Sequence, residues 1–499
     1  MKNKDFRKLN KGFLLGILAL LSIFLLSCRS EKDQLIPITS GDDFTVYLPI
    51  LKNGDETPPV EVKDVPTIHI PYIDEADITA ESLPEMAVFW FGKVKINDNY
   101  TDVRIAFNDE AFFVYTASFD RLLWYDNSPS VMNLEEWDSI ALFIMPGNGT
   151  QLITNQGFRF DAGLAPIEAV RSDYQKSYKW NGSNWNLENI PFSTVSMWRG
   201  PGLNDADDDR GWNLSFRIPY TSLGLSQKPQ DGTIWQMGIV AYDRDYQNST
   251  NISPAIWPLE FDNVNNLSWG KISFGLLQNT VSNATIQGSL IIREGLNGNL
   301  VPDASPGGHT ICGTYLNFWT EWGEKVYTPT ENFTAIIQNQ RDIADWPCYS
   351  KFFIKFPIPE LPQGNSLIKA TLKLHLYGNS GDWGDPVFQP YRSLIQVGVT
   401  NSNWSENTLN WNNAPILQEN ISQVWVEPEE LFPGWPGVPY EWDITIAVNH
   451  AIANDEDEIS LVLYSADGAY HSGKYFSTSE ADDWNAEARP TLILDYGNR

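Results

Sequence analysis

The chain has 499 residues, among them 20 tryptophans, 20 tyrosines and only 5 histidines, and its formal charge at pH 7 is -29. A surface this acidic repels nucleic-acid phosphates, so we expect no nucleic-acid partner. The excess of aromatic side chains over histidines suits stacking surfaces better than acid–base or metal chemistry. The length allows more than one domain.

Residues 1–27 have the features of an export signal. The chain begins with Lys2, Lys4 and Arg7, continues with an apolar run over 12–26, and has Ser27 directly before Cys28. A basic start, a short apolar core and a small residue describe a secretory signal and not a spanning helix. Loss of 1–27 removes five basic side chains and one acid, so the remaining chain carries a charge of -33.

The segment 25–28, Leu-Leu-Ser-Cys, resembles a bacterial lipobox. This resemblance implies that the Cys28 thiol is diacylated and becomes the first residue of the mature protein. It also implies that the chain is exported and anchored by lipid to the outer face of the cell membrane or to the cell surface. The alternative is an ordinary signal peptide with an incidental cysteine. Residues 28–64, rich in Ser, Gly, Pro and charges, are interpreted as a flexible linker behind that anchor.

Short alternating strands begin at residue 65. The segments 103–107 and 214–218 alternate with period two, and 139–144 and 239–242 are shorter apolar runs. A second series of strands covers 289–292, 370–376, 395–399 and 459–463, with one predicted helix at 446–453. This spacing, almost without helical periodicity, predicts an all-β chain of two antiparallel, jelly-roll-like β-sandwiches in tandem, a first module at 65–280 and a second module at 281–499.

Catalytic signatures are absent from the sequence, which has neither His-Glu-x-x-His nor Gly-x-Ser-x-Gly, and we predict no catalytic residue. Asp205, Asp207 and Asp209 concentrate oxygen ligands in one loop, which predicts a structural calcium site and no other cofactor. A solvated acidic loop is the alternative. Cys312 and Cys348 are candidates for a disulfide in an oxidising compartment, or else two free thiols.

Four segments of the first module resemble a family 9 carbohydrate-binding module. They are 138–140 (Asp-Ser-Ile), 158–160 (Phe-Arg-Phe), 219–223 (Pro-Tyr-Thr-Ser-Leu) and 265–269 (Asn-Asn-Leu-Ser-Trp). In sugar-binding members two tryptophans sandwich a terminal sugar ring, because the apolar C–H face of a pyranose stacks on an electron-rich ring.

The resemblance implies a set of sugar contacts in the first module. They are Trp137, Arg159, Tyr242, Asn266 and Trp269. Packing in the core or at its rim is the alternative for both tryptophans. The chain departs from the family at Ala141, where an acidic sugar contact is expected.

The second module resembles the DNRLRE-type domain of surface polysaccharide-degrading proteins, grouped with carbohydrate-binding module family 96. The segments that carry this resemblance are 352–356, 476–481 and, most specifically, 404–415, Trp-Ser-Glu-Asn-Thr-Leu-Asn-Trp-Asn-Asn-Ala-Pro. We interpret Trp404 and Trp411 as structural. Further tryptophans lie in Gly- or Pro-rich loops, where we expect exposed rings able to contact a glycan: Trp319, Trp322, Trp383 and Trp435.

Together these features predict a surface-anchored, non-catalytic lipoprotein whose partners are a polysaccharide and, through the N-terminal lipid, a membrane. One alternative is a glycoside hydrolase or polysaccharide lyase, or an accessory protein to one, with its site in the second module. Another is a structural or adhesive spacer at the cell surface. A haem-binding first module is a further alternative, although its only histidine is His69.

Overall fold

The computed structural model describes residues 65–128, 133–147, 156–248, 254–278, 284–307, 316–328, 331, 334–339, 349–429, 432–467 and 471–498. These residues belong to one compact unit. Cys28, Cys312 and Cys348 lie outside the described residues, as do the predicted signal and linker. The lipid attachment and the disulfide therefore stay predictions, and so does the boundary at residue 280.

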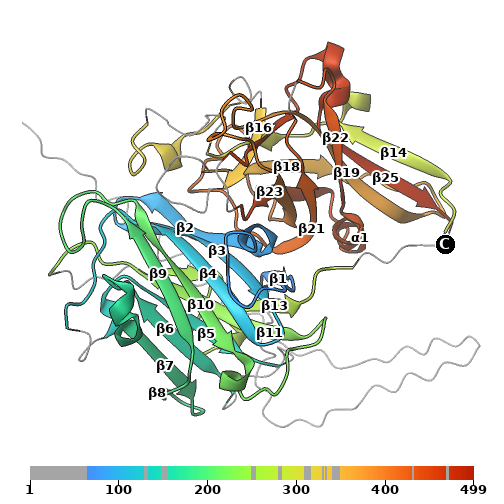
Figure 1. Ribbon diagram of the computed structural model, residues 1–499. Coiled ribbons are helices and arrows are strands. Elements are labelled where there is room, and N and C mark those ends of the chain that lie inside the picture. The colour runs from blue at the N-terminus through green and yellow to red at the C-terminus, as the bar shows by residue number, and fades with distance from the viewer. Residues whose placement is uncertain are drawn as a thin grey trace, which may run out of the picture. The chain divides into compact units, whose positions relative to one another are not determined.

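The first module is a β-sandwich (Figure 1). One sheet has five strands in the order β2 (Ala87–Lys95), β3 (Asp98–Phe107), β4 (Ala111–Phe119), β10 (Gly211–Pro219) and β9 (Ser193–Arg199). The other contains β1 (Thr67–Ile70), β13 (Gly270–Phe274), β11 (Ile234–Tyr242), β5 (Ser139–Met145), β6 (Phe158–Gly163), β7 (Gln175–Trp180) and β8 (Trp185–Leu187), with β12 (Ala255–Trp257) beside β11. Alternating apolar side chains such as Val103 and Ile105 fill the space between the sheets.

The second module repeats this architecture. Its first sheet contains β15 (Asp303–Ala304), β18 (Phe352–Pro357), β23 (Glu458–Ser465), β20 (Ser393–Val399) and β21 (Glu419–Val426). The facing sheet has β14 (Gly288–Arg293), β25 (Thr491–Gly497), β19 (Ser366–Asn379), β24 (Lys474–Ser477), β16 (Thr334–Asn339) and β17 (Tyr349–Ser350), with β22 (Val438–Asp443) beside β19. The helix α1 (Thr445–Ala453) follows β22. The predicted fold class, strands and helix are confirmed.

Strand β1 connects the two modules into one sheet. It pairs in parallel with β13 along its whole length and touches β21 at Thr67 and Glu419. The backbone N–H of Thr67 donates to Gln418 O at 2.7 Å. Asn420 binds both backbone groups of His69, accepting from its N–H at 2.7 Å and donating to its carbonyl at 2.8 Å. The first-module sheet therefore continues into the second module.

A buried lysine lies where the modules meet. The Nζ atom of Lys351 lies 3.7 Å from the ring centroid of Trp411 and 4.1 Å from that of Trp90, and donates to Tyr100 Oη at 2.6 Å. Tyr100 and Tyr464 in turn donate to the buried carboxylate of Asp102 at 2.6 and 2.9 Å. Trp90, Tyr100 and Asp102 belong to the first module and the others to the second, so this aromatic cage joins them.

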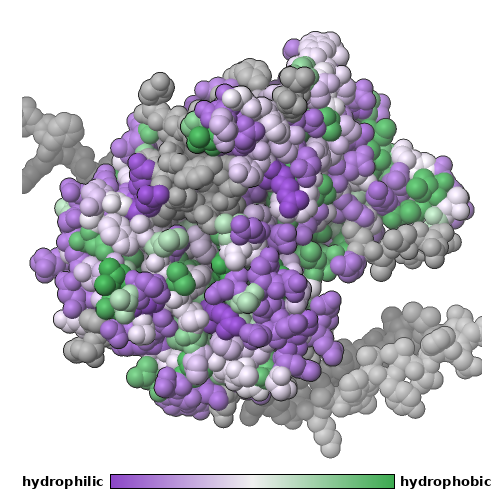
Figure 2. Space-filling model, in the orientation of Figure 1, coloured by the Kyte–Doolittle hydropathy of each residue, from purple (hydrophilic) through white to green (hydrophobic). Residues whose placement is uncertain are grey.

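Hydrophilic side chains predominate on the face shown in Figure 2, and hydrophobic ones form small separate areas there. This agrees with the acidic composition of the chain. Within the described ranges, no helix is both long enough and apolar enough to span a membrane.

Candidate functional site

Three exposed aromatic rings gather at one place on the second module, the cluster Phe432–Trp435–Trp484. Their side chains are 54%, 52% and 67% exposed. The ring centroids of Phe432 and Trp435 lie 5.0 Å apart, and those of Trp435 and Trp484 lie 5.5 Å apart with an angle of 88° between the planes. The two indole rings therefore meet nearly at right angles, and each residue is more than half exposed.

The sheet beneath supports this corner. Trp435 lies in the turn before β22, between Gly434 and Gly437, which both have positive φ. Its ring is 6.1 Å from that of Tyr377 on β19, and the Tyr377 hydroxyl bonds the Thr334 hydroxyl. Trp435 thus contacts the sheet through Tyr377.

Polar groups surround Trp484. It lies in a 3-10 turn, η9 (Asp483–Ala488), and its indole N–H donates to Asp482 Oδ2 at 3.0 Å. Arg489 donates to the almost fully exposed Asp483 at 2.8 Å. Ring faces flanked by carboxylates and a guanidinium offer stacking and hydrogen bonding at one site.

A second exposed aromatic group lies on the loop between β19 and β20. It contains Trp383, Phe388 and Tyr391, which are 41%, 48% and 53% exposed. The indole N–H of Trp383 donates to the carbonyl of Glu429, three residues before Phe432. The loop is therefore tied to the segment that leads into the cluster.

The expected exposure is right for Trp383 and Trp435 and wrong for Trp319 and Trp322. Trp319 and Trp322 are 4% and 1% exposed, because they pack on Phe318 with ring centroids 5.0 and 4.9 Å away. Phe432 and Trp484 were missed, although the polar neighbours of Trp484, Asp-Asp-Trp-Asn, are a signal of an exposed loop. Trp404 and Trp411 are buried, as their structural interpretation requires.

Trp269, implied as a stacking platform, is fully buried. Trp185 of β8 stacks beside it, with centroids 6.4 Å apart and an angle of 18° between the planes, and Phe261 and Phe143 pack against it at 5.7 and 5.8 Å. In this arrangement the chain's own rings surround Trp269. Stacking on a sugar would require Trp185 or Phe261 to move.

The structure brings Arg159 and Tyr242 together on the outer face of the same sheet. Arg159 donates to both oxygens of Asp161, at 2.7 and 2.6 Å, and also to Glu135. Burial raises the pKa of Asp161 to about 6, against the opposing effect of the Arg159 charge. Burial also raises the pKa of Tyr242 well above its usual value. Arg159 is thus committed to two carboxylates of its own chain.

The other two implied sugar contacts have separate partners. Trp137 is half-buried and lies under the guanidinium of Arg244, 4.1 Å from its ring centroid. Asn266 is fully buried and exchanges hydrogen bonds with Gln236, whose side chain donates to Asn266 O at 2.8 Å. Nothing in these contacts tests sugar binding, so the roles implied for the first module stay predictions.

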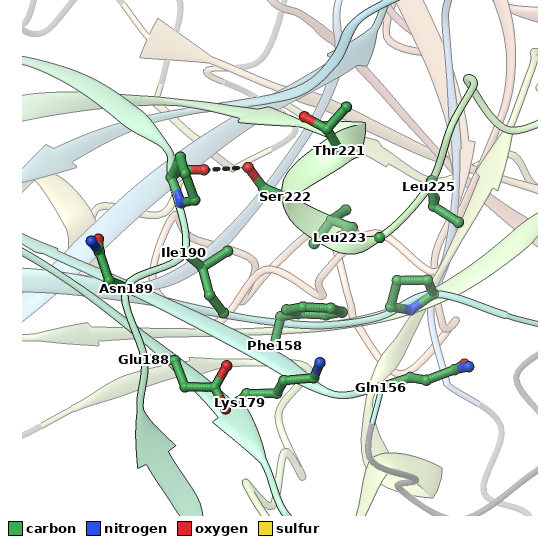
Figure 3. Close-up of a pocket in the computed structure, with 13 residues that line it drawn as sticks. Gln156, Phe158, Lys179, Glu188, Asn189, Ile190, Thr221, Ser222, Leu223 and Leu225 are labelled. Carbon is green, nitrogen blue, oxygen red and sulfur yellow. Dashed lines mark hydrogen bonds between the residues drawn. The ribbon is translucent and has the colours of Figure 1, made fainter.

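A pocket of about 500 Å³ opens elsewhere on the first module (Figure 3). Its lining includes Phe158, Lys179 and Glu188 and the turn η5 (Tyr220–Leu223), where Ser222 Oγ donates to Pro191 O at 2.5 Å. None of the implied sugar contacts lines it. Its one aromatic ring, Phe158, is 4% exposed and offers little face for stacking.

The three predicted calcium ligands differ in exposure, and the calcium site stays a prediction. Asp205 and Asp207 are exposed, and Asp205 Oδ1 accepts from the backbone N–H of Asp207 at 2.9 Å. Asp209 is buried and accepts from Leu123 N at 2.9 Å. Sequence reasoning missed another group of three buried aspartates, because its members lie far apart in the chain: Asp120, Asp138 and Asp243.

Residues 330–495 match the sequence model of carbohydrate-binding module family 96. This confirms the resemblance stated for the second module, and the matched range contains Trp435 and Trp484. It covers one module, so it describes that module and not the whole chain. The search among curated proteins found no match.

Solved structures similar to this chain include a proposed carbohydrate-binding protein from Bacteroides uniformis, with 12% identity and a TM-score of 0.31 over 42% of this chain and 99% of that one. Two others are family 9 carbohydrate-binding modules from Caldicellulosiruptor kristjanssonii. The complex with cellotriose has 17% identity and a TM-score of 0.29 over 44% of this chain and 99% of that one. The complex with glucose has 15% identity and a TM-score of 0.29 over 43% of this chain and 98% of that one. These two neighbours are modules of the family that the first module resembles in sequence.

Proposed function

We propose that this chain is a non-catalytic, polysaccharide-binding lipoprotein at the cell surface, and that the cluster Phe432–Trp435–Trp484 holds the glycan. The observation that carries the proposal is the pair of exposed indole rings 5.5 Å apart. Two large rings more than half exposed are costly to leave in water unless a partner covers them. Their faces suit the apolar face of a pyranose.

The polar rim supports a sugar as the partner. Asp482, Asp483 and Arg489 lie next to Trp484 and supply acceptors and donors for hydroxyl groups. Carboxylates next to an aromatic ring are more compatible with a hydroxyl-bearing ligand than with a purely apolar one. The match of this module to carbohydrate-binding module family 96 supports the same ligand class.

The anchor rests on the lipobox-like segment that ends at Cys28. Lipid at the N-terminus and glycan at the second module would hold polysaccharide against the cell that makes the chain. Labelling with a palmitate analogue tests this part separately. Cys28→Ser should abolish the label and release the protein from the membrane fraction, and a label that persists in the variant would contradict the anchor.

Affinity electrophoresis of residues 29–499 through gels containing plant, algal or bacterial glycans tests the binding. We expect retardation by at least one glycan, with no release of reducing ends or unsaturated products from it. Uniform mobility in every gel, with and without calcium, would contradict binding. Products from a glycan that binds would favour an enzyme instead.

A further inference from the structure

The loop between β19 and β20 carries the second group of exposed aromatic rings, Trp383, Phe388 and Tyr391, to which the proposed function gives no role. Val387, in the same loop, is 76% exposed. Several large apolar side chains that stay in water at one place are costly and mark a surface that a partner covers. The loop is therefore a candidate contact for a ligand.

Hydrogen bonds within the loop hold its backbone in one conformation. The backbone N–H of Asp382 donates to Phe388 O at 2.6 Å. The side-chain amide of Gln389 donates to the carbonyls of Trp383 and Asp385 at 3.1 and 2.7 Å. A loop that is ordered before binding loses less conformational entropy when a ligand arrives. The backbone that carries these rings is thus preorganised.

The second aromatic group and the cluster Phe432–Trp435–Trp484 are attached to the same end of strand β19. Trp435 lies beside Tyr377 of this strand, with ring centroids 6.1 Å apart. Two residues further along, Asn379 Oδ1 accepts from the Glu429 N–H at 2.8 Å. The carbonyl of Glu429 in turn accepts from the indole N–H of Trp383 at 3.2 Å. Since two residues of a strand span about 7 Å, the attachment points are neighbours.

The other end of the loop returns to the same place. Lys474 of β24 pairs with Asn379, and its buried ammonium donates to Tyr391 O. The backbone N–H of Tyr391 donates to His471 O at 3.1 Å. Both ends of the loop are therefore fixed near the last residue of β19, and a glycan chain only a few sugars long would reach from one group of rings to the other.

The surface around both groups of rings is acidic. Its carboxylates are all at least partly exposed and belong to Asp382, Asp385, Glu427, Glu429, Asp482 and Asp483. Of the cations nearby, Arg489 is paired with Asp483 at 2.8 Å. The guanidinium of Arg392 lies over Trp425 of β21, in the facing sheet, 4.0 Å from its ring centroid. The negative charge that remains repels an anionic ligand.

We propose that the second aromatic group binds the same glycan chain as the cluster Phe432–Trp435–Trp484, and that this chain is an uncharged polysaccharide. The inference rests on the proposed function and adds a second contact and a ligand class to it. Stacking on aromatic rings needs no charge on the sugar, and sugar hydroxyls can donate to the carboxylates around the rings. A chain of uronic acids or sulfated sugars would place its negative charges against these carboxylates.

Affinity electrophoresis of the full chain in detergent tests the ligand class. At least one gel containing soluble β-glucan, mannan or galactan should retard the chain, and a gel containing polygalacturonate should not. The matched probe is the bound glycan after oxidation of its C6 hydroxyls to carboxylates, which should bind at least tenfold more weakly at low salt. Added salt should recover part of that loss, because it screens repulsion between exposed charges.

Phe388→Ala/Tyr391→Ala tests the second contact, since the loop's hydrogen bonds at these positions use backbone atoms. With oligosaccharides of increasing length, the affinity of the parent should rise until the ligand reaches both groups of rings. The variant should lose this rise and bind the shortest ligand as the parent does, with an unchanged urea unfolding midpoint. Tyr246→Ala, an exposed aromatic of the first module, is the control and should match the parent at every length.

The outcomes separate this inference from the proposed function. If Trp435→Ala/Trp484→Ala loses binding and Phe388→Ala/Tyr391→Ala keeps the affinity of the parent at every length, the proposed function stands and the second contact is overturned. Equal affinity for the oxidised and the original glycan overturns the uncharged ligand. A chain that binds no glycan contradicts both.

Discussion

Trp435 and Trp269 are both tryptophans, but one is exposed at the surface and the other is buried. Trp435 is 52% exposed and lies beside Trp484, whereas Trp269 is fully buried among Trp185, Phe261 and Phe143. A sugar can stack only on a ring face that water can reach. The local sequence of each is a Gly- or Asn-rich turn, so only the neighbours supplied by the fold distinguish them.

Lys474 gives a prediction about pH at the scale of one residue. Its ammonium is buried and donates to the carbonyls of Ser472, at 2.7 Å, and Tyr391. Burial lowers the pKa of Lys474 from 10.5 to about 8. Between these values the unfolded chain binds more protons than the folded one, so this residue adds stability as pH rises.

The free energy of unfolding of the parent, relative to that of Lys474→Met, should therefore increase by about 2 kcal/mol between pH 7.5 and 10. Urea unfolding of both proteins at both pH values measures this difference. Taking the difference between the parent and the variant cancels the contribution of the other residues that titrate in both proteins. A constant difference over this range would contradict the lowered pKa.

At the scale of elements, alternation predicts the strands well. The pattern of 103–107 places Val103 and Ile105 on one face of β3 and Arg104 on the other, and the strand forms as expected. The sequence does not reveal that the second module covers the polar face. Arg104 is fully buried there and donates to Ala466 O at 3.0 Å. A charged side chain usually lies on a solvated face. The burial of Arg104 is therefore explained by the packing of the second module on β3.

The same limit applies to the candidate site. The resemblance to known families directs attention to Trp269 and Arg159, but it cannot show that Trp185 and Phe261 surround Trp269. The Gly- or Pro-rich sequence of their loops correctly predicted that Trp383 and Trp435 are exposed. The corner between Trp435 and Trp484 depends on two segments about 50 residues apart that meet only in the folded sheet.

The hydrogen bonds that hold strand β1 against the second module should contribute measurably to stability. Asn420→Ala removes both hydrogen bonds to the backbone of His69 and leaves these buried groups without partners. We expect the free energy of unfolding to fall by about 2 kcal/mol in urea titrations. The matched control is Asn401→Ala, an exposed loop residue that accepts one bond from Asn403 at 3.2 Å, which should change it by less than about 0.5 kcal/mol. Equal effects would contradict a special role for β1.

At the scale of the whole molecule, one hydrophobic cluster extends across both modules, and a separate cluster fills the sandwich of the second module. The cluster that contains Phe89 and Trp257 of the first module continues through Trp322, Trp411 and Tyr464 of the second. The cage around Lys351 adds a buried ammonium held by groups from both modules. Separation would expose this lysine's partners and leave Asp102 without the Tyr464 bond. Two linked sandwiches of this kind behave as one structural unit.

We therefore expect the chain to unfold in a single cooperative transition, with calorimetric and van't Hoff enthalpies that agree. Differential scanning calorimetry of residues 29–499 measures both. Two resolved transitions, each assignable to one module, would contradict this coupling between the modules.

Glycan binding by Trp435 and Trp484 is the central claim, and titration calorimetry on a glycan that retards the parent protein tests it most directly. Trp435→Ala/Trp484→Ala should weaken binding at least tenfold, since each lost stacking face is worth about 1 kcal/mol or more. Tyr246→Ala is the control, an aromatic 53% exposed on the first module, and it should bind as the parent does. Unchanged affinity in the double tryptophan variant, with the fold intact by circular dichroism, would contradict the account.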